Sequence, residues 1–323
     1  MPNLSSLEEK ALNTLLKNEA KYSKQIQQQL LDALTSIYGE MTKIYDKYAV
    51  DGKLTKAEMT KYNKYSTMED QILKKLEPAL KNNIKTIQKL LPEQFQQSFF
   101  QYAWALDNGT GLRLSWGLVN LKSLLAPFDI TNPKNIYIQN ALKNYSLNAK
   151  KNIRSALLNG LSQGKPFAAM AKDIKKSVNK IYSDAMVIAR TEGMNAINAG
   201  QAYSYLQAEE MGIEGGPVWS CTKDDKTRDT HIEMDGATRV QTDEQDGWIL
   251  PDGSFTEGPG NNYADHPGDE QLPPEERCNC RCNCRFEVAG YSPQLMRTRE
   301  EGVIPYQNYN DYAKEYHPDW LEE

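Results

Sequence analysis

Apolar residues recur at helical spacing through most of the first 150 residues, separated by lysines, glutamines and acids. The apolar positions of the first stretch are Leu7, Leu12, Leu15, Leu16, Ile26, Leu30, Leu31 and Leu34. Such positions fall on one side of a helix with 3.6 residues per turn, so the pattern predicts long amphipathic helices. Ser6 stands three residues before Glu9 and can cap the first of them.

The helical pattern is interrupted by "VDGKLT" at residues 50–55, which predicts a turn. Thr55 lies three residues before Glu58 and can cap the helix that follows. A calcium-binding loop aligned on this segment would take its first and third ligands from Lys47 and Ala49, and neither side chain binds calcium. We therefore interpret the segment as a turn.

Helical patterns resume in the second half of the chain. A helix is predicted from Ser146 onward, with a break at Gln-Gly-Lys-Pro (residues 163–166) and another helix after it. A long helix follows, capped by Ser183 or Asp184 and ended by Gly212.

The pattern then changes to short strands and long loops. Residues 216–223, "GPVWSCTK", are typical of a strand, and a polar segment and a Gly-, Pro- and Asp-rich stretch follow. The fold class predicted is α+β, with a long-helix N-terminal half before a helical and small antiparallel-sheet domain. A Pro- and Asn-rich connection is predicted at residues 127–135. The predicted divisions are a lysine-rich helical domain (1–145), the α+β domain (146–290) and a C-terminal tail (291–323).

Four cysteines stand at every second position in the run "CNCRCNC", at Cys278, Cys280, Cys282 and Cys284. On a strand they share one face, with Asn279, Arg281, Asn283 and Arg285 on the other. The Cα atoms of neighbouring cysteines would then lie about 6.6 Å apart, which is at the upper limit for a disulfide bond. Two zinc-bound sulfurs must lie within about 4 Å, which a flat strand does not allow.

The cysteine run is therefore predicted to be a strand beside "GPVWSCT", with its thiols inward as small apolar groups and no stoichiometric zinc. Zinc is the less favoured alternative. Its ligands would come from Cys221, Cys278, Cys280, Cys282 and Cys284, with His231 and His266 as further donors.

The composition is that of a water-soluble protein without a membrane span. Of 323 residues, 39% are apolar and 25% charged, and this length suits about two domains. No stretch has the roughly 18–20 uncharged apolar residues of a spanning helix, and the N-terminus lacks the pattern of a secretory signal. Five cysteines, an odd number, favour reduced thiols and synthesis in a cytoplasm.

Charge is divided unevenly along the chain. Residues 1–180 hold 27 Lys and Arg against 15 Asp and Glu, and residues 181–323 hold 11 against 28. All the cations of the first part are lysines except Arg113 and Arg154. Lysine neutralises phosphate without reading bases, so weak, non-specific, salt-dependent DNA binding is expected of the first part and not of the second. Lysines that face an acidic partner or solvent are the open alternative.

A series of motifs between residues 190 and 282 resembles the Mu F-like domain of minor capsid, or head morphogenesis, proteins of tailed phages. The motif residues are Arg190, Thr191 and Glu192; Trp219; Asp225, Arg228 and His231; Asp235 and Gly236; and Glu276, Asn279, Cys280, Arg281 and Cys282. The resemblance covers about residues 150–288. The additional Cys278 and Cys284, which flank "NCRC", depart from the family pattern.

The resemblance implies a structural role in the virion. Proteins of this family bind the portal, enter the procapsid in few copies, and associate with packaged DNA or assist its delivery. Portal protein and DNA are thus the expected partners, the major capsid or scaffolding protein is a further candidate, and no cofactor is expected. Some relatives carry a toxin domain after the Mu F-like part; the residues after Val288 are too few for one, so no effector is expected.

An enzyme is the alternative to a capsid protein. The segment Asp225–Asp235 is rich in groups that bind metals or transfer protons, as in a metal-dependent nuclease. These groups are Asp225, Asp229, His231, Glu233 and Asp235, and Asp224 directly precedes the segment. The chain lacks a phosphate-binding glycine loop, a nucleophile elbow and an H-E-x-x-H motif. We therefore interpret the segment as a charged turn, with Arg228 paired to Asp225 or Asp229, and expect no enzymatic activity.

Overall fold

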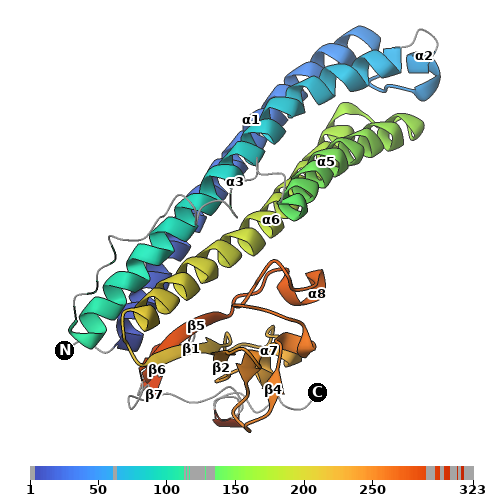
Figure 1. Cartoon of the computed structure of the whole chain (residues 1–323). Coiled ribbons are helices and arrows are strands. Elements are labelled where there is room, and N and C mark those ends of the chain that lie inside the picture. The colour runs from blue at the N-terminus through green and yellow to red at the C-terminus, as the bar shows by residue number, and fades with distance from the viewer. Residues whose placement is uncertain are drawn as a thin grey trace. The chain divides into compact units, whose positions relative to one another are not determined.

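The structure is a computed structural model that describes residues 4–60, 64–112, 114, 116, 128, 135–288, 295–298, 302–305, 311, 314 and 315. Its long helices are α1 (Leu4–Tyr48), α3 (Lys64–Thr110), α5 (Ile136–Ser162) and α6 (Phe167–Glu210), and short helices are α2 (Lys56–Thr60), α7 (Asp229–Glu233) and α8 (Pro274–Arg277) (Figure 1). Among these residues, no helix has the length and apolar character needed to cross a membrane.

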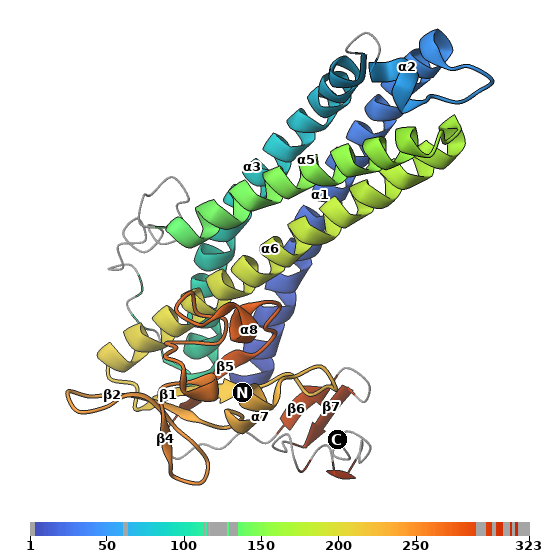
Figure 2. The same ribbon diagram turned by 90° about the vertical axis from the view of Figure 1, so that its right-hand side faces the viewer.

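The strands follow α6 and form two antiparallel sheets (Figure 2). The larger sheet has the order β4-β3-β2-β1-β5. Its strands are β1 (Gly215–Ser220), β2 (Thr238–Gln241), β3 (Asp246–Ile249), β4 (Phe255–Thr256) and β5 (Asn283–Val288), with the 3-10 helix η3 (Pro259–Asn261) before α8. β6 (Leu295–Thr298) pairs with β7 (Gly302–Pro305). The predicted α+β class is confirmed.

The chain folds into two compact units that both combine distant parts of the sequence. The sheet unit comprises Met1–Asn18, Leu91–Phe128 and Arg190–Glu323, and the helical unit comprises Glu19–Leu90 and Asp129–Ala189. α1, α3 and α6 each contribute residues to both units. The boundary predicted between residues 145 and 146 falls inside α5.

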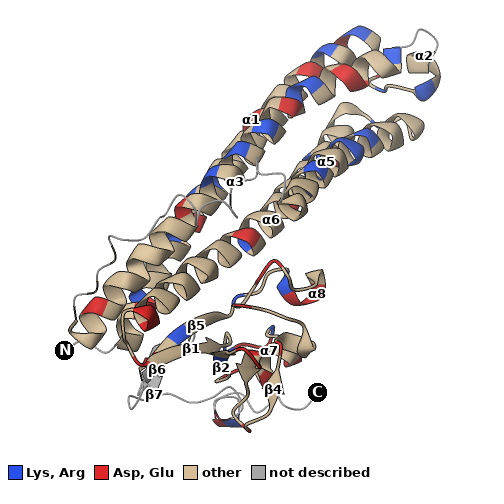
Figure 3. Cartoon of the chain, viewed as in Figure 1, with Lys and Arg blue, Asp and Glu red and all other residues tan. Residues whose placement is uncertain are grey.

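The helical unit carries most of the chain's positive charge. It holds 23 Lys and Arg against 12 Asp and Glu, a net charge of +11, which leaves −16 for the sheet unit. The lysines lie along the outer sides of its helices (Figure 3), while Leu80, Ile153 and Ile181 are among its fully buried residues. The uneven charge of the sequence is therefore a difference between two folded bodies.

Several predicted ends of helices are confirmed. α6 ends two residues before Gly212, which adopts a positive φ of 91°. The turn after α1 places Asp51 and Gly52 at φ values of 50° and 71°, in the region that favours glycine. Gln163 to Pro166 separate α5 from α6. The predicted connection at 127–135 lies almost wholly outside the described residues.

Three predicted starts of helices are wrong. Ser183 and Asp184 lie inside α6, which is continuous because apolar residues continue at helical spacing on its buried side. Asp184 instead pairs with Lys180 one turn earlier, at 2.6 Å. Ser6 lies inside α1, which already includes Leu4. α5 begins ten residues before Ser146, at Ile136.

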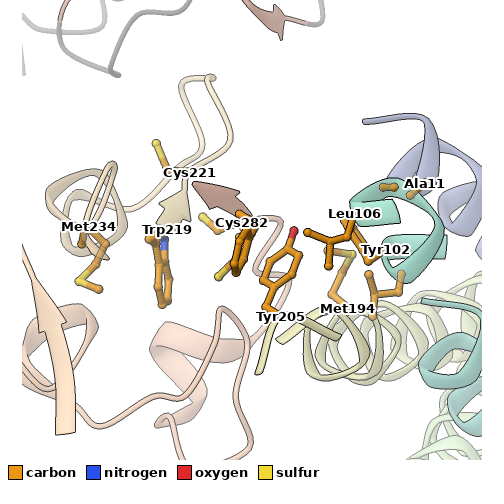
Figure 4. Packing of buried hydrophobic residues seen from close by; sticks show 14 of the residues in the cluster. Ala11, Tyr102, Leu106, Met194, Tyr205, Trp219, Cys221, Met234 and Cys282 are labelled. Atoms are coloured by element: carbon orange, nitrogen blue, oxygen red, sulfur yellow. The ribbon is translucent and has the colours of Figure 1, made fainter. Parts of the chain in front are cut away.

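Aromatic side chains form the centre of the sheet unit's core (Figure 4). Trp219 of β1 and Trp248 of β3 are fully buried and meet edge to face, with ring centroids 5.1 Å apart. Tyr102 of α3 and Tyr205 of α6 meet in the same way at 5.9 Å, and Tyr205 also contacts Phe286 of β5 at 5.1 Å. These contacts join the helices of this unit to its sheet.

Polar side chains of the helices satisfy the outer edge of β5. Gln201 of α6 accepts a hydrogen bond from the Cys284 N–H at 3.1 Å and donates to its carbonyl at 2.7 Å. Asn198, one turn earlier, donates to the Cys282 carbonyl at 3.0 Å. The Phe286 N–H donates to Glu8 of α1 at 3.0 Å. The edge strand is thus covered by side chains that replace a neighbouring strand.

Glu8 is a buried carboxyl group whose ionisation opposes folding. It is 5% exposed and accepts a hydrogen bond from the Tyr205 hydroxyl at 2.5 Å. Burial raises the pKa of Glu8 from 4.5 to about 7, although the hydrogen bonds from Tyr205 and Phe286 act in the opposite direction. The folded protein therefore holds this proton at pH values where the unfolded chain has lost it.

Replacing Glu8 by Gln should remove a pH-dependent loss of stability. The Glu8 contribution to the free energy of unfolding is lost as the pH rises from 4.5 to about 7, because only the unfolded chain ionises in that range. Above pH 7, Glu8→Gln should be more stable than the natural protein by up to about 3 kcal/mol, and below pH 4.5 this gain should vanish. Denaturant unfolding between pH 4 and 8 measures it, with Glu9→Gln as the control. A difference independent of pH would contradict the assignment.

Candidate functional site

The "RTE" motif on α6 anchors the segment that contains the cysteines. The Thr191 hydroxyl accepts a hydrogen bond from the Asn279 N–H at 3.1 Å. Glu192 forms an ion pair with Arg277 of α8 at 2.5 Å, while Arg190 is exposed. The first and last motifs of the series, far apart in the sequence, are therefore in direct contact.

The pair formed by Glu192 and Arg277 is almost completely enclosed. Their side chains are 8% and 1% exposed. Burial raises the pKa of Glu192, and the charge and hydrogen bond of Arg277 act against that rise. The Arg277 guanidinium also donates to the Gly268 carbonyl at 3.4 Å. A buried carboxylate is tolerated here because a cation in hydrogen-bond contact compensates for lost hydration.

Trp219, Asp235 and Gly236 form a second connection. The Gly236 N–H donates to the Trp219 carbonyl at 2.9 Å, and Gly236 has a positive φ of 87°, which favours glycine. Asp235 is buried; it accepts from the Cys221 N–H at 3.0 Å and pairs with the Lys223 ammonium group. These residues fix the turn that follows α7 against β1.

The acidic residues of the segment Asp225–Asp235 do not gather around His231. Asp225, Asp229 and Glu233 are exposed, whereas His231 is 1% exposed. Asp224, outside the motif, pairs with Arg281 at 2.8 Å, and this interaction lowers the pKa of Asp224 against the effect of its burial. The Arg228 guanidinium donates to the Cys278 carbonyl at 2.5 Å.

The cysteine run is only partly a strand, which corrects the prediction. Cys278 directly follows α8, Asn279 has a positive φ of 56°, and β5 begins at Asn283. The run therefore turns sharply before it becomes extended, because the preceding helix and the contact with Thr191 fix its backbone. From Arg281 onward the predicted alternation is confirmed, with Cys282 and Cys284 buried and β5 paired with β1.

The turn brings two thiols to the same ring nitrogen of His231. The sulfurs of Cys280 and Cys282 lie 3.6 and 3.5 Å from its Nδ1 atom. Among the described residues, these three form the one group of His, Cys, Asp or Glu ligand atoms within 4.8 Å of one another. Cys221, Cys278, Cys284 and His266 are not members of it.

The two thiols differ in pKa, and a carboxylate lies on the opposite side of the His231 ring. A hydrogen bond from Cys282 lowers the pKa of Cys280, helped by the nearby Arg228 and Arg281, while the same contact raises the pKa of Cys282. The Nε2 atom of His231 lies 3.2 Å from a Glu276 carboxylate oxygen. That oxygen also accepts a hydrogen bond from the Thr230 hydroxyl at 2.8 Å.

Comparison with known proteins identifies the domain that holds these motifs. Residues 151–285 match the family described as Phage Mu protein F like protein. The chain carries a Mu F-like domain. This finding confirms the resemblance drawn from the sequence motifs. No solved structure matches the chain significantly.

Relatives of the Mu F-like chain include phage and bacterial proteins. Minor head protein GP7 of Bacillus phage SPP1 is 26% identical over 87% of this chain and 88% of its own length. An NAD(+)–arginine ADP-ribosyltransferase, EFV, of Enterococcus faecalis is 26% identical over 71% of this chain, and an uncharacterised Haemophilus influenzae protein 29% over 62%. The chain spans only 44% and 38% of the lengths of the latter two.

Several residues that build the site carry no sequence signal of their own. Arg277 precedes the "NCRC" motif, Asn198 and Gln201 follow "RTE" by two and three turns, and Glu8 lies at the other end of the chain. A polar residue on the buried side of a helix is the one available signal. Such a residue indicates that a hydrogen-bond partner is needed, but the sequence does not identify that partner.

Breaking the buried pair should destabilise the Mu F-like domain strongly. Arg277→Met leaves Glu192 enclosed without its cation, which should cost about 3–5 kcal/mol in the free energy of unfolding. Arg281→Met, which removes the half-exposed partner of Asp224, should cost about 1 kcal/mol or less. Chemical denaturation of the two variants compares them directly. Equal losses would show that the buried pair has no special role.

Proposed function

We propose that this protein is a minor head protein of a tailed phage that binds the portal and enters the procapsid during assembly. The observation that supports this proposal best is the similarity to a minor head protein over nearly the whole length of both chains. In this proposal the protein resides in the virion, inside the head or at the portal vertex. The major capsid or scaffolding protein is a further candidate partner.

The protein is proposed to act without catalysis. The internal contacts of its motifs support this: Thr191, Glu192 and Asp235 each bind another part of the chain. The exposed acids near His231 do not converge on it. More than half of the length of the ADP-ribosyltransferase relative lies outside the match. The match by itself therefore does not support the activity that its name states.

Portal binding is tested by co-expression of the full-length protein with the portal protein of the same phage. The two should co-purify and co-migrate in size-exclusion chromatography across low and moderate salt. The portal of an unrelated phage serves as the control and should not be retained. Failure of the cognate pair to associate at every salt concentration would refute the portal proposal.

DNA association is proposed for the helical unit because its exposed lysines give it a net charge of +11. Lys172, Lys175 and Lys176 are exposed near the start of α6 at helical spacing. Such a surface displaces counterions from the phosphate backbone and has few arginines for base recognition. Binding is therefore expected to be weak, independent of sequence and strongly reduced by salt.

Charge reversal in the full-length protein should locate the DNA-binding surface. Replacing Lys172, Lys175 and Lys176 by Glu should weaken binding to random duplexes and reduce the slope of log affinity against log salt by about 2–3. The matched control reverses three exposed lysines of the sheet unit, Lys10, Lys17 and Lys226, and should have a smaller effect. Equal effects, or no binding by the natural protein at about 50 mM salt, would refute the proposal.

A further inference from the structure

His231, Cys280 and Cys282 converge with the geometry of a metal site. Zinc bonds of about 2.3 Å to sulfur and 2.0–2.1 Å to nitrogen, at the tetrahedral angle, separate a sulfur from a nitrogen by about 3.5–3.6 Å. The two sulfurs lie 3.6 and 3.5 Å from the same nitrogen, Nδ1 of His231. All three side chains are at least 96% buried.

The backbone around the thiols is held in this arrangement by the fold itself. Asn279 adopts its left-handed conformation while its N–H donates to Thr191. The Cys280 N–H donates to the Arg277 carbonyl at 3.1 Å, and the Cys282 carbonyl accepts from Asn198. The left-handed turn at Asn279, just before Cys280, brings both thiols to Nδ1 of His231, so the geometric objection that a flat strand raises against a C-x-C pair does not apply. A preformed site loses little conformational entropy when it binds an ion.

A Glu276 carboxylate lies beside His231, where carboxylates are common in metal sites. Its oxygen lies 3.2 Å from Nε2, the ring nitrogen that faces away from the thiols. If Nδ1 binds a metal ion, the proton of the neutral imidazole is carried by Nε2, which lies beside this carboxylate. Thr230 donates to the same oxygen and fixes the carboxylate in turn.

A small pocket borders the three ligands and offers room for a fourth. Thr222, Thr227 and Arg228 line it together with His231, Cys280 and Cys282. Two thiolates and a neutral imidazole around a divalent ion give a neutral group, which lowers the cost of burial relative to bare thiolates. Thiolate and imidazole ligands favour zinc over magnesium or calcium, which prefer oxygen.

We propose that His231, Cys280 and Cys282 bind one zinc ion, with a water molecule in the pocket as the fourth ligand. The ion links α7 to the segment just before β5 across 48 intervening residues. This segment contains β2, β3, β4 and the long loops between them. The site is a structural cross-link of the Mu F-like domain, independent of whether the domain binds a portal.

Metal analysis of the full-length protein, purified without chelator and exposed to equimolar zinc, tests the proposal. The natural protein should retain close to one zinc per chain after desalting, and Cys280→Ser and Cys282→Ser should each lose it. Cys278→Ser is the matched control, because it removes a thiol of the same run that lies outside the group. Retention of zinc by this control is expected.

Two measurements separate metal loss from misfolding. A strong chelator should lower the melting temperature of the natural protein and of Cys278→Ser, and should leave that of Cys280→Ser unchanged. Cobalt added to metal-free natural protein should give the visible bands of a tetrahedral ion with thiolate ligands, which Cys282→Ser should lack.

Background zinc in the natural protein, or equal zinc in Cys280→Ser and the natural protein, would overturn the proposal. A disulfide between Cys280 and Cys282 in the metal-free natural protein with no uptake of zinc after reduction would do so as well.

Discussion

The outer edge of β5 is the constraint on which the rest of the sheet unit depends. In the described part of the chain this strand lies at the end of the sheet order, so its outward N–H and C=O groups need partners other than a strand. Gln201, Asn198 and Glu8 supply them from two helices. Because each side chain meets one particular backbone group, the contacts set the position of β5 along α6, and thus the position of the cysteines that precede it.

The family motifs gain a physical meaning from this arrangement. Thr191 and Glu192 hold the segment before β5, at Asn279 and Arg277, as Asn198 and Gln201 hold the strand itself. One face of α6 therefore binds a continuous stretch of chain through polar contacts spaced at helical intervals. Unlike apolar packing, such contacts tolerate no shift in register, since a shift would leave buried polar groups without partners.

The sequence predicts those features that depend on local periodicity. The burial of Cys282 and Cys284, the end of α6 before Gly212 and the pairing of β5 with β1 all follow from apolar spacing and turn residues. The bend at Asn279 does not, because a non-glycine residue in the left-handed region is held there by tertiary contacts that no local pattern encodes. The continuity of α6 through Ser183 and Asp184 was missed because polar residues that can cap a helix also suit its exposed side.

The bend also decides what chemistry the cysteine run can support. Alternating cysteines on a straight strand would present their thiols in a row, each too far from the next to share a ligand. Here Asn279 turns the backbone before Cys280. Cys280, Cys282 and Cys284 all belong to the buried core, and Cys280 and Cys282 also lie against His231. One repeated residue type thus serves two purposes, apolar packing and a polar cluster. The left-handed conformation of Asn279, whose N–H donates to Thr191 of α6, sets the course of the backbone that enters the pair beside His231.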